Sequence, residues 1–306
     1  MEKGVVIKST GSWYLVRNDK GEQVQCRIRG KLRLKGSRTT NPVAVGDLVE
    51  LEKGSDGYVI ARIGERRNYV IRKSTNLSKE SHIIAANVDL ALLIATIDHP
   101  ETSTVFIDRF LATTEAYRIP AAIVFNKTDL YDETALNRLE ELKFLYESIG
   151  YPVLAISASR GDNLEEVKNL LKDKITVLSG MSGVGKSSLI NRIEPELHLK
   201  TALISEAHDT GKHTTTFAEM FELKEGGYII DTPGLRSFGM IDMQKEEISH
   251  FFPEIFRTAS QCRFYNCTHT HEPGCAVIQA LRQGKISESR YWSYLSILED
   301  SGEKYR

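Results

Sequence analysis

The stretch VLSGMSGVGKSSLIN, residues 177–191, decides the fold of the central part of this chain. Gly180, Gly185, Lys186 and Ser187 within it fit the pattern G-x-x-x-x-G-K-[ST], a loop whose backbone N–H groups surround phosphate oxygens. The apolar residues before the loop predict a buried strand, and the residues after it predict a helix. This order predicts an α/β domain that holds phosphate at the N-terminus of a helix.

Each residue type in this loop suits a phosphate for a physical reason. Glycine lets the backbone approach phosphate oxygens without obstruction by a Cβ atom. The ammonium of Lys186 would neutralise charge on the β- and γ-phosphates, the hydroxyl of Ser187 would ligate Mg²⁺, and Ser188 would contact the α-phosphate. The full set of predicted phosphate-binding residues is Gly180, Met181, Ser182, Gly183, Val184, Gly185, Lys186, Ser187 and Ser188.

A second motif, NKTD at residues 126–129, ends the predicted strand AAIVFN. Guanine presents two N–H donors on one edge, and the carboxylate of Asp129 can accept both, whereas adenine lacks this pair of donors. Asn126 can contact the O6/N7 edge of the ring and brace the phosphate loop, and the aliphatic stem of Lys127 can cover the base. The motif, completed by Thr128, therefore predicts guanine selection.

Two further motifs also follow predicted strands. The sequence SAS begins with Ser157 and Ala158, and a backbone N–H of this motif can reach guanine O6. The sequence DTPG begins at Asp231, whose carboxylate can hold a water on Mg²⁺, while the N–H of Gly234 can meet the γ-phosphate. A simple turn explains any one of these motifs alone, but four motifs that each follow a strand favour a nucleotide site.

The order of the motifs along the chain differs from that of Ras-like domains. There the phosphate loop comes first and the guanine-reading motifs come last, whereas here NKTD and SAS precede the phosphate loop. This order is a cyclic permutation, which a folded domain tolerates because its termini often lie close together. After DTPG the chain runs directly into its C-terminal segment, so we expect nucleotide state to be transmitted there through the covalent chain.

Changes in hydrophobic pattern divide the 306 residues into three predicted domains. Residues 1–73 contain five short strand patterns separated by Gly, Asn and Asp, which fit a small closed barrel, either an OB-fold or an SH3-like barrel. Residues 74–240 alternate apolar strands with helical patterns, which is typical of a mainly parallel sheet. Residues 241–306 combine helical patterns with a cysteine cluster.

The N-terminal domain differs from the rest of the chain in charge. Residues 1–73 carry a net charge of +8, and the remaining residues therefore carry −9, since the whole chain carries −1. A basic module on an acidic body predicts a polyanionic partner such as RNA. Trp13 and Tyr14 could stack on bases unless they lie in the barrel core, and Cys26 is expected to be a buried thiol. One run contains six basic residues and no acidic residue: Arg27, Arg29, Lys31, Arg33, Lys35 and Arg38.

Three of the four cysteines lie in the sequence CRFYNCTHTHEPGC, residues 262–275. Three thiolates and one imidazole suit tetrahedral Zn²⁺, and a site with four protein ligands is structural rather than catalytic. Buried free cysteines and an iron–sulfur cluster are the alternatives. His269 and His271 compete for the fourth position, and the predicted thiolate ligands are Cys262, Cys267 and Cys275.

The C-terminal segment, residues 285–306, has apolar residues at helical spacing. We expect three of them to pack on the cysteine-containing domain: Tyr291, Leu295 and Leu298. Three basic residues in and before this segment are expected to be available to RNA: Arg282, Lys285 and Arg290.

With these motifs the sequence resembles the ribosome small-subunit-dependent GTPase A family. The resemblance rests on the permuted order and on GMSGVGKSSLIN, GKHTTT at residues 211–216 and DTPG, and with the two terminal domains it covers essentially the whole chain. It implies an OB-fold, a circularly permuted GTPase domain and a mainly helical zinc-binding domain, and it favours His269 as the fourth zinc ligand. It also implies GTP hydrolysis stimulated by the small ribosomal subunit, contact with its rRNA, and a role in its late maturation.

Hydrolysis needs a group that orients the attacking water, and in Ras-like proteins a Gln after the D-x-x-G glycine does so. Leu235 occupies that position here and cannot orient water, so intrinsic hydrolysis should be slow. His213 in GKHTTT is the best local candidate, and the resemblance favours a catalytic role over that of a solvated loop histidine. Thr214, Thr215 and Thr216 compete to ligate Mg²⁺ in the GTP state, and we favour Thr215. The predicted catalytic residues are therefore His213, Thr215, Lys186 and Asp231.

Composition is that of an ordinary soluble protein, with 41% hydrophobic and 26% charged residues and no apolar run long enough to span a membrane. The N-terminus lacks the apolar core of a signal peptide, so we expect a cytoplasmic protein. We further expect a monomer that binds GTP or GDP with Mg²⁺ and holds one structural Zn²⁺. Asp129 disfavours an ATP-dependent kinase, intact Lys186 disfavours a domain that has lost nucleotide binding, and the basic barrel disfavours a GTPase of metabolism or membranes. A GTP-dependent switch on another RNA or ribonucleoprotein is the remaining alternative.

The variant His213→Ala should lower GTP turnover by on the order of a hundredfold while changing GTP affinity much less, because the imidazole would act on the attacking water. Single-turnover hydrolysis and equilibrium binding of a GTP analogue measure the two quantities. An equal loss of both would reject the catalytic role of His213.

Overall fold

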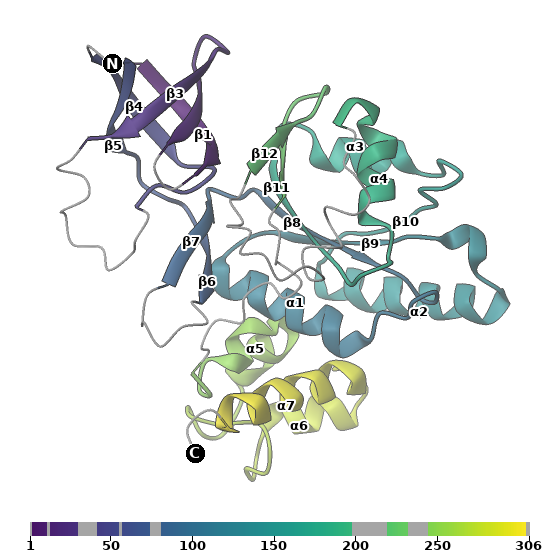
Figure 1. The fold of residues 1–306 in the computed structure, drawn as a ribbon. Helices are drawn as coiled ribbons and strands as arrows, with labels where there is room; N and C mark the ends of the chain where they lie inside the picture. The colour runs from purple at the N-terminus through teal and green to yellow at the C-terminus, as the bar shows by residue number, and fades with distance from the viewer. Residues whose placement is uncertain are drawn as a thin grey trace.

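The computed structural model describes residues 2–10, 13–29, 42–54, 57–73, 81–197, 219–231 and 244–303. A barrel and a helical domain lie at opposite ends of the molecule, with a sheet-containing domain between them (Figure 1). The three-part organisation predicted from the sequence is therefore present. The domain boundaries at residues 73/74 and 240/241 stay predictions.

The N-terminal barrel consists of five strands. They are β1 (Glu2–Ser9), β2 (Tyr14–Asn18), β3 (Gln23–Ile28), β4 (Leu48–Gly54) and β5 (Gly57–Ile63). They pair in the order β1-β2-β3-β5-β4, β1 also pairs with β4 to close the barrel, and the β3–β5 pair is parallel. This is the connectivity of an OB-fold, so the predicted OB-fold is confirmed over the SH3-like alternative.

Alternation of side chains along the strands separates the barrel core from its surface. Tyr14 and Cys26 are completely buried in the core, and burial raises the pKa of the Cys26 thiol to about 11. Tyr14 is therefore no stacking platform. Trp13 is 39% exposed instead, and the guanidinium of Arg27 lies 4.0 Å from the centre of its ring.

A two-stranded antiparallel pair, β6 (Tyr69–Lys73) and β7 (Ser81–Ala86), follows the barrel. The central sheet then comprises β8 (Leu90–Ala95), β9 (Ala121–Phe125), β10 (Val153–Ala155), β11 (Ile175–Ser179), β12 (Glu219–Glu222) and β13 (Tyr228–Asp231). Its spatial order is β10-β9-β8-β11-β13-β12, in which only β12 runs antiparallel to its neighbour within this sheet. The chain winds from β8 towards β10 in one direction and from β11 to β13 in the other. Ligands of such sheets bind where the winding direction reverses, which here is between β8 and β11.

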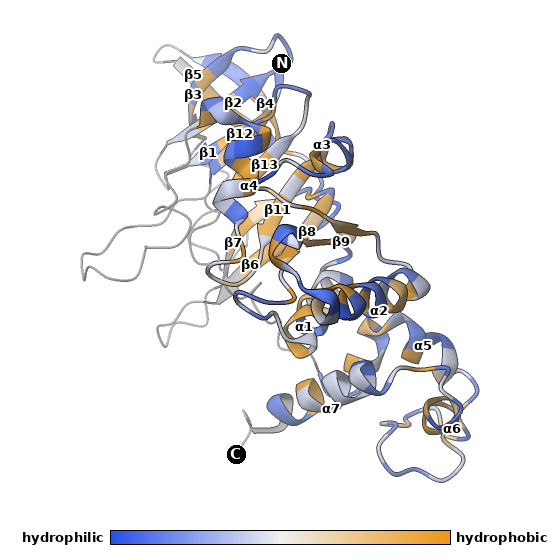
Figure 2. Ribbon diagram, turned by 90° about the vertical axis from the view of Figure 1, so that its right-hand side faces the viewer, coloured by the Kyte–Doolittle hydropathy of each residue, from blue (hydrophilic) through white to orange (hydrophobic). Residues whose placement is uncertain are grey.

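Helices cover both faces of this sheet (Figure 1). One face carries α1 (Thr104–Tyr117) and α2 (Glu133–Ile149), and the other carries α3 (Leu164–Leu171) and α4 (Lys186–Ile193). Every residue of β8 is buried, and its successive side chains enter two separate cores: Leu93 packs on the α1 side and Leu92 on the α4 side. The strands are accordingly continuous apolar runs, as expected for a sheet covered on both faces (Figure 2).

Residues at both ends of α2 fix where this helix begins and ends. Asp132 precedes α2, and its side chain accepts a hydrogen bond from the backbone N–H of Ala135, which satisfies a free donor of the first turn. Gly150 follows the last residue with φ of 121°, a conformation that glycine adopts without a steric penalty. The chain then turns directly into β10.

The C-terminal domain is helical. It comprises the 3₁₀ helix η4 (Ile248–Phe251), α5 (Pro253–Ala259), α6 (Ala276–Arg282) and α7 (Glu288–Glu303), and its core extends to Ala112 of α1. The predicted packing of Tyr291, Leu295 and Leu298 against this domain is confirmed. Across the ranges that the structure describes, no helix is both long and apolar enough to cross a bilayer.

A buried charge network joins this domain to the central one. Arg290 of α7 is completely buried and donates to Asp108 of α1 at 2.9 Å and to Glu254 of α5 at 2.7 Å. Tyr146 of α2 donates to the same oxygen of Asp108 at 2.9 Å, and the Arg290 guanidinium lies 4.5 Å from the ring centre of Phe252. The prediction that Arg290 is available to RNA is therefore wrong, because its charge is used inside the protein.

The barrel meets the central sheet through β12. Lys8 of β1 pairs with Glu219 of β12 along the backbone, and their side chains form an ion pair of 2.9 Å. Arg17 of β2 forms a second ion pair, with Glu222 at the other end of β12. These two contacts connect the barrel to the edge strand of the sheet.

The variant Arg290→Met should lower the free energy of unfolding by about 3–5 kcal/mol at pH 7, because it leaves the buried carboxylate of Asp108 and the partly buried carboxylate of Glu254 without their positive charge. Burial raises the pKa of Asp108, and Arg290 opposes that rise. A raised carboxyl pKa costs stability above the unfolded-state value, so the loss should be larger at pH 8 than at pH 5. Urea denaturation followed by circular dichroism measures the effect, and Arg282→Met, a change at an exposed arginine, should remain close to the unmodified protein. A loss of the same size in both variants would contradict this account.

Candidate functional site

The phosphate loop connects β11 to α4 at the reversal point of the sheet. Gly180 and Gly185 have φ of 146° and 93°. A Cβ atom at Gly180 would lie 2.3 Å from the carbonyl oxygen of Ile94, and one at Gly185 would lie 2.4 Å from the side-chain nitrogen of Asn126. Both positions therefore need glycine for backbone conformation and for close approach to neighbouring elements.

Lys186, the first residue of α4, folds back over this loop. Its ammonium donates to the carbonyl oxygens of Gly180 at 2.8 Å and Met181 at 2.7 Å. Ser187 is half-buried and Ser188 exposed in the same first turn, beside the exposed loop residues Ser182 and Gly183. The loop therefore presents a cation and hydroxyl groups at the N-terminus of a helix, which favours an anionic ligand.

Asn126 joins three segments that are far apart in the sequence. Its side-chain nitrogen donates to the carbonyl oxygen of Val184 at 2.9 Å, and its side-chain oxygen accepts from the N–H of Ala158 at 3.0 Å. The side chain is buried, with 2% of its surface exposed. The N–H of Ala158 in the SAS motif is thus donated to Asn126 in this structure. Asn126 holds the NKTD, SAS and phosphate-loop segments in one place.

Asp129 is held by two serine hydroxyls. Ser157 donates to one carboxylate oxygen at 2.6 Å, and Ser159 donates to the other at 2.8 Å. The hydrogen bond from Ser157, reinforced by that from Ser159, lowers the pKa of Asp129 below its ordinary value of 3.8. The side chain is therefore ionised at neutral pH and can only accept hydrogen bonds, as recognition of two N–H groups requires.

The rest of the NKTD loop is fixed by contacts that the sequence did not predict. Lys127 has φ of 67°, and its ammonium donates to the carbonyl oxygen of His99. The N–H of Thr128 donates to the carbonyl oxygen of Ile156 at 3.1 Å. Tyr131 donates to the carbonyl oxygen of Asn126 at 2.6 Å and accepts from the N–H of residue 97 at 2.8 Å. No motif marks Tyr131, because its role depends on a loop from another strand.

Several predicted residues lie outside the described part of the chain. These are His213, Thr214, Thr215, Thr216, Gly234 and Leu235, and four basic residues of the N-terminal run, Lys31, Arg33, Lys35 and Arg38. Asp231 is the last residue of β13, where its backbone pairs with Glu219, and its side chain is not described. The structure therefore brings together the base-reading and phosphate-loop residues, and the predicted water-activating residues stay predictions.

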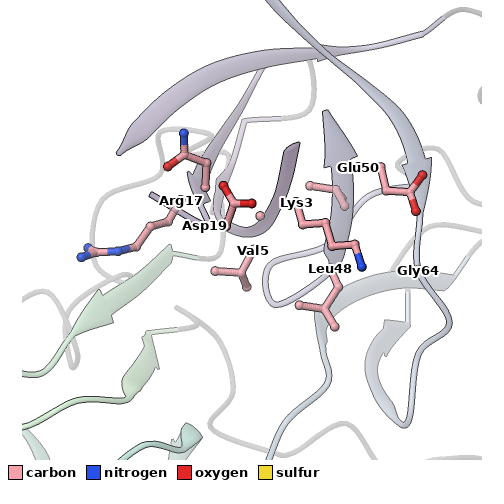
Figure 3. A pocket seen from close by; sticks show the side chains of 10 residues that line it. Lys3, Val5, Arg17, Asp19, Leu48, Glu50 and Gly64 are labelled. Atoms are coloured by element: carbon pink, nitrogen blue, oxygen red, sulfur yellow. The ribbon is translucent and has the colours of Figure 1, made fainter. Parts of the chain in front are cut away.

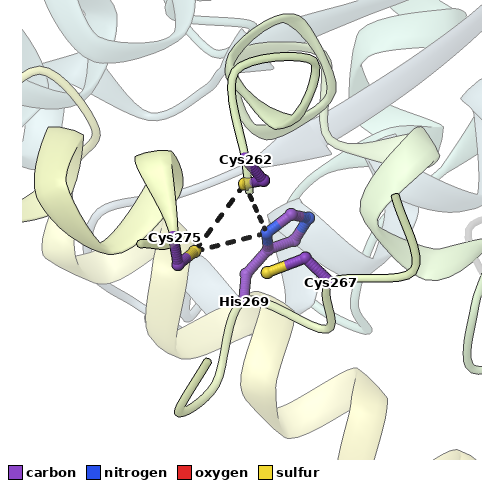
Figure 4. Close-up of side chains that lie close together, drawn as sticks. All are labelled: Cys262, Cys267, His269 and Cys275. Carbon is purple, nitrogen blue, oxygen red and sulfur yellow. Dashed lines mark hydrogen bonds between the residues drawn. The ribbon is translucent and has the colours of Figure 1, made fainter. Parts of the chain in front are cut away.

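The four predicted metal ligands form one cluster in the C-terminal domain (Figure 4). The Nδ1 atom of His269 lies 3.6 Å from the Sγ of Cys262 and 3.5 Å from that of Cys275, and these two sulfurs are 3.9 Å apart. With Cys267, all four ligand atoms lie within 4.8 Å of one another. Ligand atoms around a tetrahedral zinc ion are about 3.5–3.8 Å apart, so the spacing suits such an ion.

Surrounding residues orient this cluster. Tyr291 donates to the carbonyl oxygen of His269 at 2.7 Å. Burial raises the pKa of the Cys267 thiol to about 12 and lowers that of His269, so the imidazole is neutral and ready to ligate. A bound cation would displace the thiol protons, which couples metal binding to proton release. His271 is exposed, and its Nδ1 contacts the Thr270 hydroxyl at 2.8 Å, outside the cluster.

Glu272 shapes the loop between the ligands, a role that sequence reasoning missed. Its carboxylate accepts from the N–H and hydroxyl of Thr268 and from the N–H groups of Thr270 and His271. Burial alone would raise the pKa of Glu272, but these hydrogen bonds lower it to about 2. An acidic residue beside two threonines is too common a pattern to reveal this role.

The barrel carries a cavity of about 440 Å³ beside the junction with β12 (Figure 3). Side chains of both charges surround an apolar part formed by Val5, Leu48 and Val49. None of the nucleotide or metal motifs contributes to it. Its remaining lining residues are Lys3, Gly4, Arg17, Asn18, Asp19, Glu50 and Gly64.

Comparison with known proteins identifies the family. A family model described as RsgA GTPase matches residues 63–241, and one described as RsgA N-terminal domain matches residues 3–59. The chain belongs to the RsgA GTPase family. Proteins named small ribosomal subunit biogenesis GTPase RsgA from Bacteroides fragilis and Porphyromonas gingivalis are each 56% identical to it. The alignments cover 99% of this chain and 99% and 98% of the two relatives.

Solved structures agree with the RsgA assignment. YjeQ from Thermotoga maritima superimposes with a TM-score of 0.82 at 35% identity, covering 98% of both chains. YloQ, described as a circularly permuted GTPase, superimposes with a TM-score of 0.78 at 32% identity, covering 99% of this chain and 95% of its own. The predicted resemblance and the predicted fold, including the permuted GTPase domain, are confirmed.

The variant His269→Ala should lose most of the metal that purified protein carries, whereas His271→Ala should retain it, because only His269 reaches the three sulfurs. Mass spectrometry of metal content, with one ion per chain expected for the unmodified protein, measures both. Retention by the first variant and loss by the second would show that the fourth ligand was assigned to the wrong histidine.

Proposed function

We propose that this RsgA-family GTPase binds GTP with Mg²⁺ and hydrolyses it on the small ribosomal subunit, late in the maturation of that particle. The observation that carries the nucleotide part is the contact of Asn126 with Val184 and Ala158, which ties the guanine-reading loops to the phosphate loop. The names of the relatives, which describe biogenesis of the small ribosomal subunit, support the biological part.

In this proposal a carboxylate binds the guanine base and an ammonium group binds the phosphates. Asp129 accepts the two N–H groups of guanine, Lys127 covers the base, and Lys186 neutralises phosphate charge. The hydroxyls of Ser187 and Thr215 would hold Mg²⁺, which supplies positive charge between the phosphates. Further contacts are assigned to Asn126, Thr128, Ser157, Ala158, Ser188, Gly234 and the loop from Gly180 to Gly185.

Hydrolysis is assigned to residues that follow the phosphate loop in the sequence. Asp231 would position a water on the metal. Leu235 stands where Ras-like proteins have the glutamine that orients the attacking water, so we assign that role to His213. Intrinsic turnover would then be slow until the bound particle completes the catalytic site. This explains why such an enzyme would need its partner for efficient hydrolysis.

The barrel is proposed to contact rRNA. Its net charge of +8 favours phosphate, and the exposed ring of Trp13 with the Arg27 guanidinium beside it offers a surface on which a base can stack. Arg29 is less available because it pairs with Glu52 at 2.6 Å. Binding through phosphates should weaken strongly as salt increases and should read little sequence.

The domain contacts suggest how nucleotide state reaches the barrel. The hairpin of β12 and β13 separates the segments that carry Thr215 and Gly234, and the ion pairs of Lys8 and Arg17 attach the barrel to β12. The buried Arg290 network attaches the helical domain to α1 and α2 instead. We therefore propose that nucleotide state reaches the barrel through β12, in addition to the C-terminal segment that follows DTPG in the chain.

The metal is proposed to be one structural Zn²⁺ held by Cys262, Cys267, His269 and Cys275, because three thiolates and an imidazole within one small cluster suit this ion. A mononuclear ion fits ligand atoms within 4.8 Å of one another better than an iron–sulfur cluster does. We also propose that the protein acts as a cytoplasmic monomer.

GTP turnover by the full-length protein should rise by on the order of tenfold or more when purified small ribosomal subunits are added, because the partner would complete the catalytic site. ATP should be hydrolysed at the background rate with and without subunits. Stimulation by a different RNA or ribonucleoprotein, with none by the small subunit, would favour the alternative of a GTP-dependent switch on that particle.

A further inference from the structure

We propose that Ser159 is a positioning residue for guanine recognition, because its hydroxyl fixes the second oxygen of the Asp129 carboxylate. This inference rests on the proposed role of Asp129 as the acceptor for the two guanine N–H groups. Ser159 was not among the residues predicted to contact nucleotide, although it is the last residue of the SAS motif. Its assignment depends on contacts that only the folded chain creates.

The three groups form a closed triangle. The Ser157 hydroxyl lies 2.6 Å from Oδ1 of Asp129, the Ser159 hydroxyl lies 2.8 Å from Oδ2, and the two hydroxyl oxygens are 3.0 Å apart. Two hydroxyls have two hydrogens for these three contacts. If each hydrogen points at the carboxylate, no hydrogen lies between the two hydroxyl oxygens.

Neighbouring groups favour that arrangement. The backbone N–H of Arg160 donates to the Ser157 oxygen at 3.1 Å, which occupies acceptor capacity there and leaves the Ser157 hydrogen free for Asp129. The ionised carboxylate is a stronger acceptor than the Ser157 oxygen, so the Ser159 hydrogen is drawn to Oδ2. The lowered pKa of Asp129, to which both hydroxyls contribute, agrees with two donors on the carboxylate.

A carboxylate held at both oxygens is oriented before the base arrives. Each oxygen has two lone-pair directions, so a hydroxyl on one of them leaves the other for a guanine N–H. Rotation of the carboxylate would lower the affinity for a ligand that bonds both oxygens more than the affinity for a ligand that bonds only one. Ser159 should therefore influence the preference for a base with two donors over a base with one.

Inosine diphosphate provides the comparison, because hypoxanthine keeps the N1–H of guanine and lacks its amino group. In the full-length protein, Ser159→Ala should reduce the affinity ratio of GDP to IDP by roughly three- to tenfold, the worth of one imperfectly placed hydrogen bond. Ser159→Thr keeps a hydroxyl and should restore the ratio. Ser148→Ala, a change at an exposed serine of α2 whose hydroxyl bonds the carbonyl oxygen of Leu145, is the matched control and should leave it unchanged.

The outcomes of this calorimetric titration separate the possible roles of Ser159. A fall in the ratio that Ser159→Thr reverses supports the proposal. Equal weakening of GDP and IDP means that Ser159 only maintains the loop, and an unchanged ratio means that its hydrogen points at Ser157; either result overturns the proposal.

A separate variant tests the assumption beneath it. Asp129→Asn should transfer preference from GDP to xanthosine diphosphate, whose second carbonyl group needs a donor where guanine needs an acceptor. Failure of that transfer would reject Asp129 as the base selector, and with it the role of Ser159. Success of the transfer with an unchanged ratio in Ser159→Ala would reject only the role of Ser159.

Discussion

The buried amide of Asn126 is the interaction on which the nucleotide site depends. One side chain uses its donor for Val184 of the phosphate loop and its acceptor for Ala158 of the SAS loop. An amide that satisfies both groups inside the protein fixes the distance between the segments it joins, since breaking either bond would leave a buried polar atom unpaired. The permuted order of the motifs is compatible with nucleotide binding because this contact needs the three segments to be adjacent in the folded domain, in whatever order they occur along the chain.

The helical domain and the barrel are attached to the central domain by different kinds of contact. The helical domain is joined to the central domain through the buried Arg290, which pairs with Asp108 of α1, and separation would leave both charges unpaired in a low-dielectric interior. The barrel is attached by two ion pairs of partly exposed side chains, a short backbone pairing and the buried side chain of Ile7, which lies in the same apolar core as Met220 of β12. Exposed pairs contribute little stability, so the apolar contact of Ile7 contributes most of this attachment.

Much of the site was predictable because each motif carries its chemistry in consecutive residues. The glycines at 180 and 185, Lys186, Asp129 and the cysteine ligands were named from residue type and spacing alone. Ser159, Tyr131 and Glu272 were missed because each acts through one hydrogen bond or one set of hydrogen bonds that no spacing rule describes. Arg290 was misplaced because an arginine at a helical position can face solvent or the interior, and its two carboxylate partners lie 36 and 182 residues away.

The sequence by itself determined the fold class, the five-stranded barrel, the permuted arrangement of the central domain and the composition of the metal cluster. These properties follow from hydrophobic periodicity and from motifs whose chemistry is local. Only the tertiary structure decided that Tyr14 lies in the barrel core while Trp13 faces outward, that His269 rather than His271 meets the sulfurs, and that Arg290 is a buried connection. Those choices depend on which face of an element is covered by a distant segment, and local sequence patterns do not contain that information.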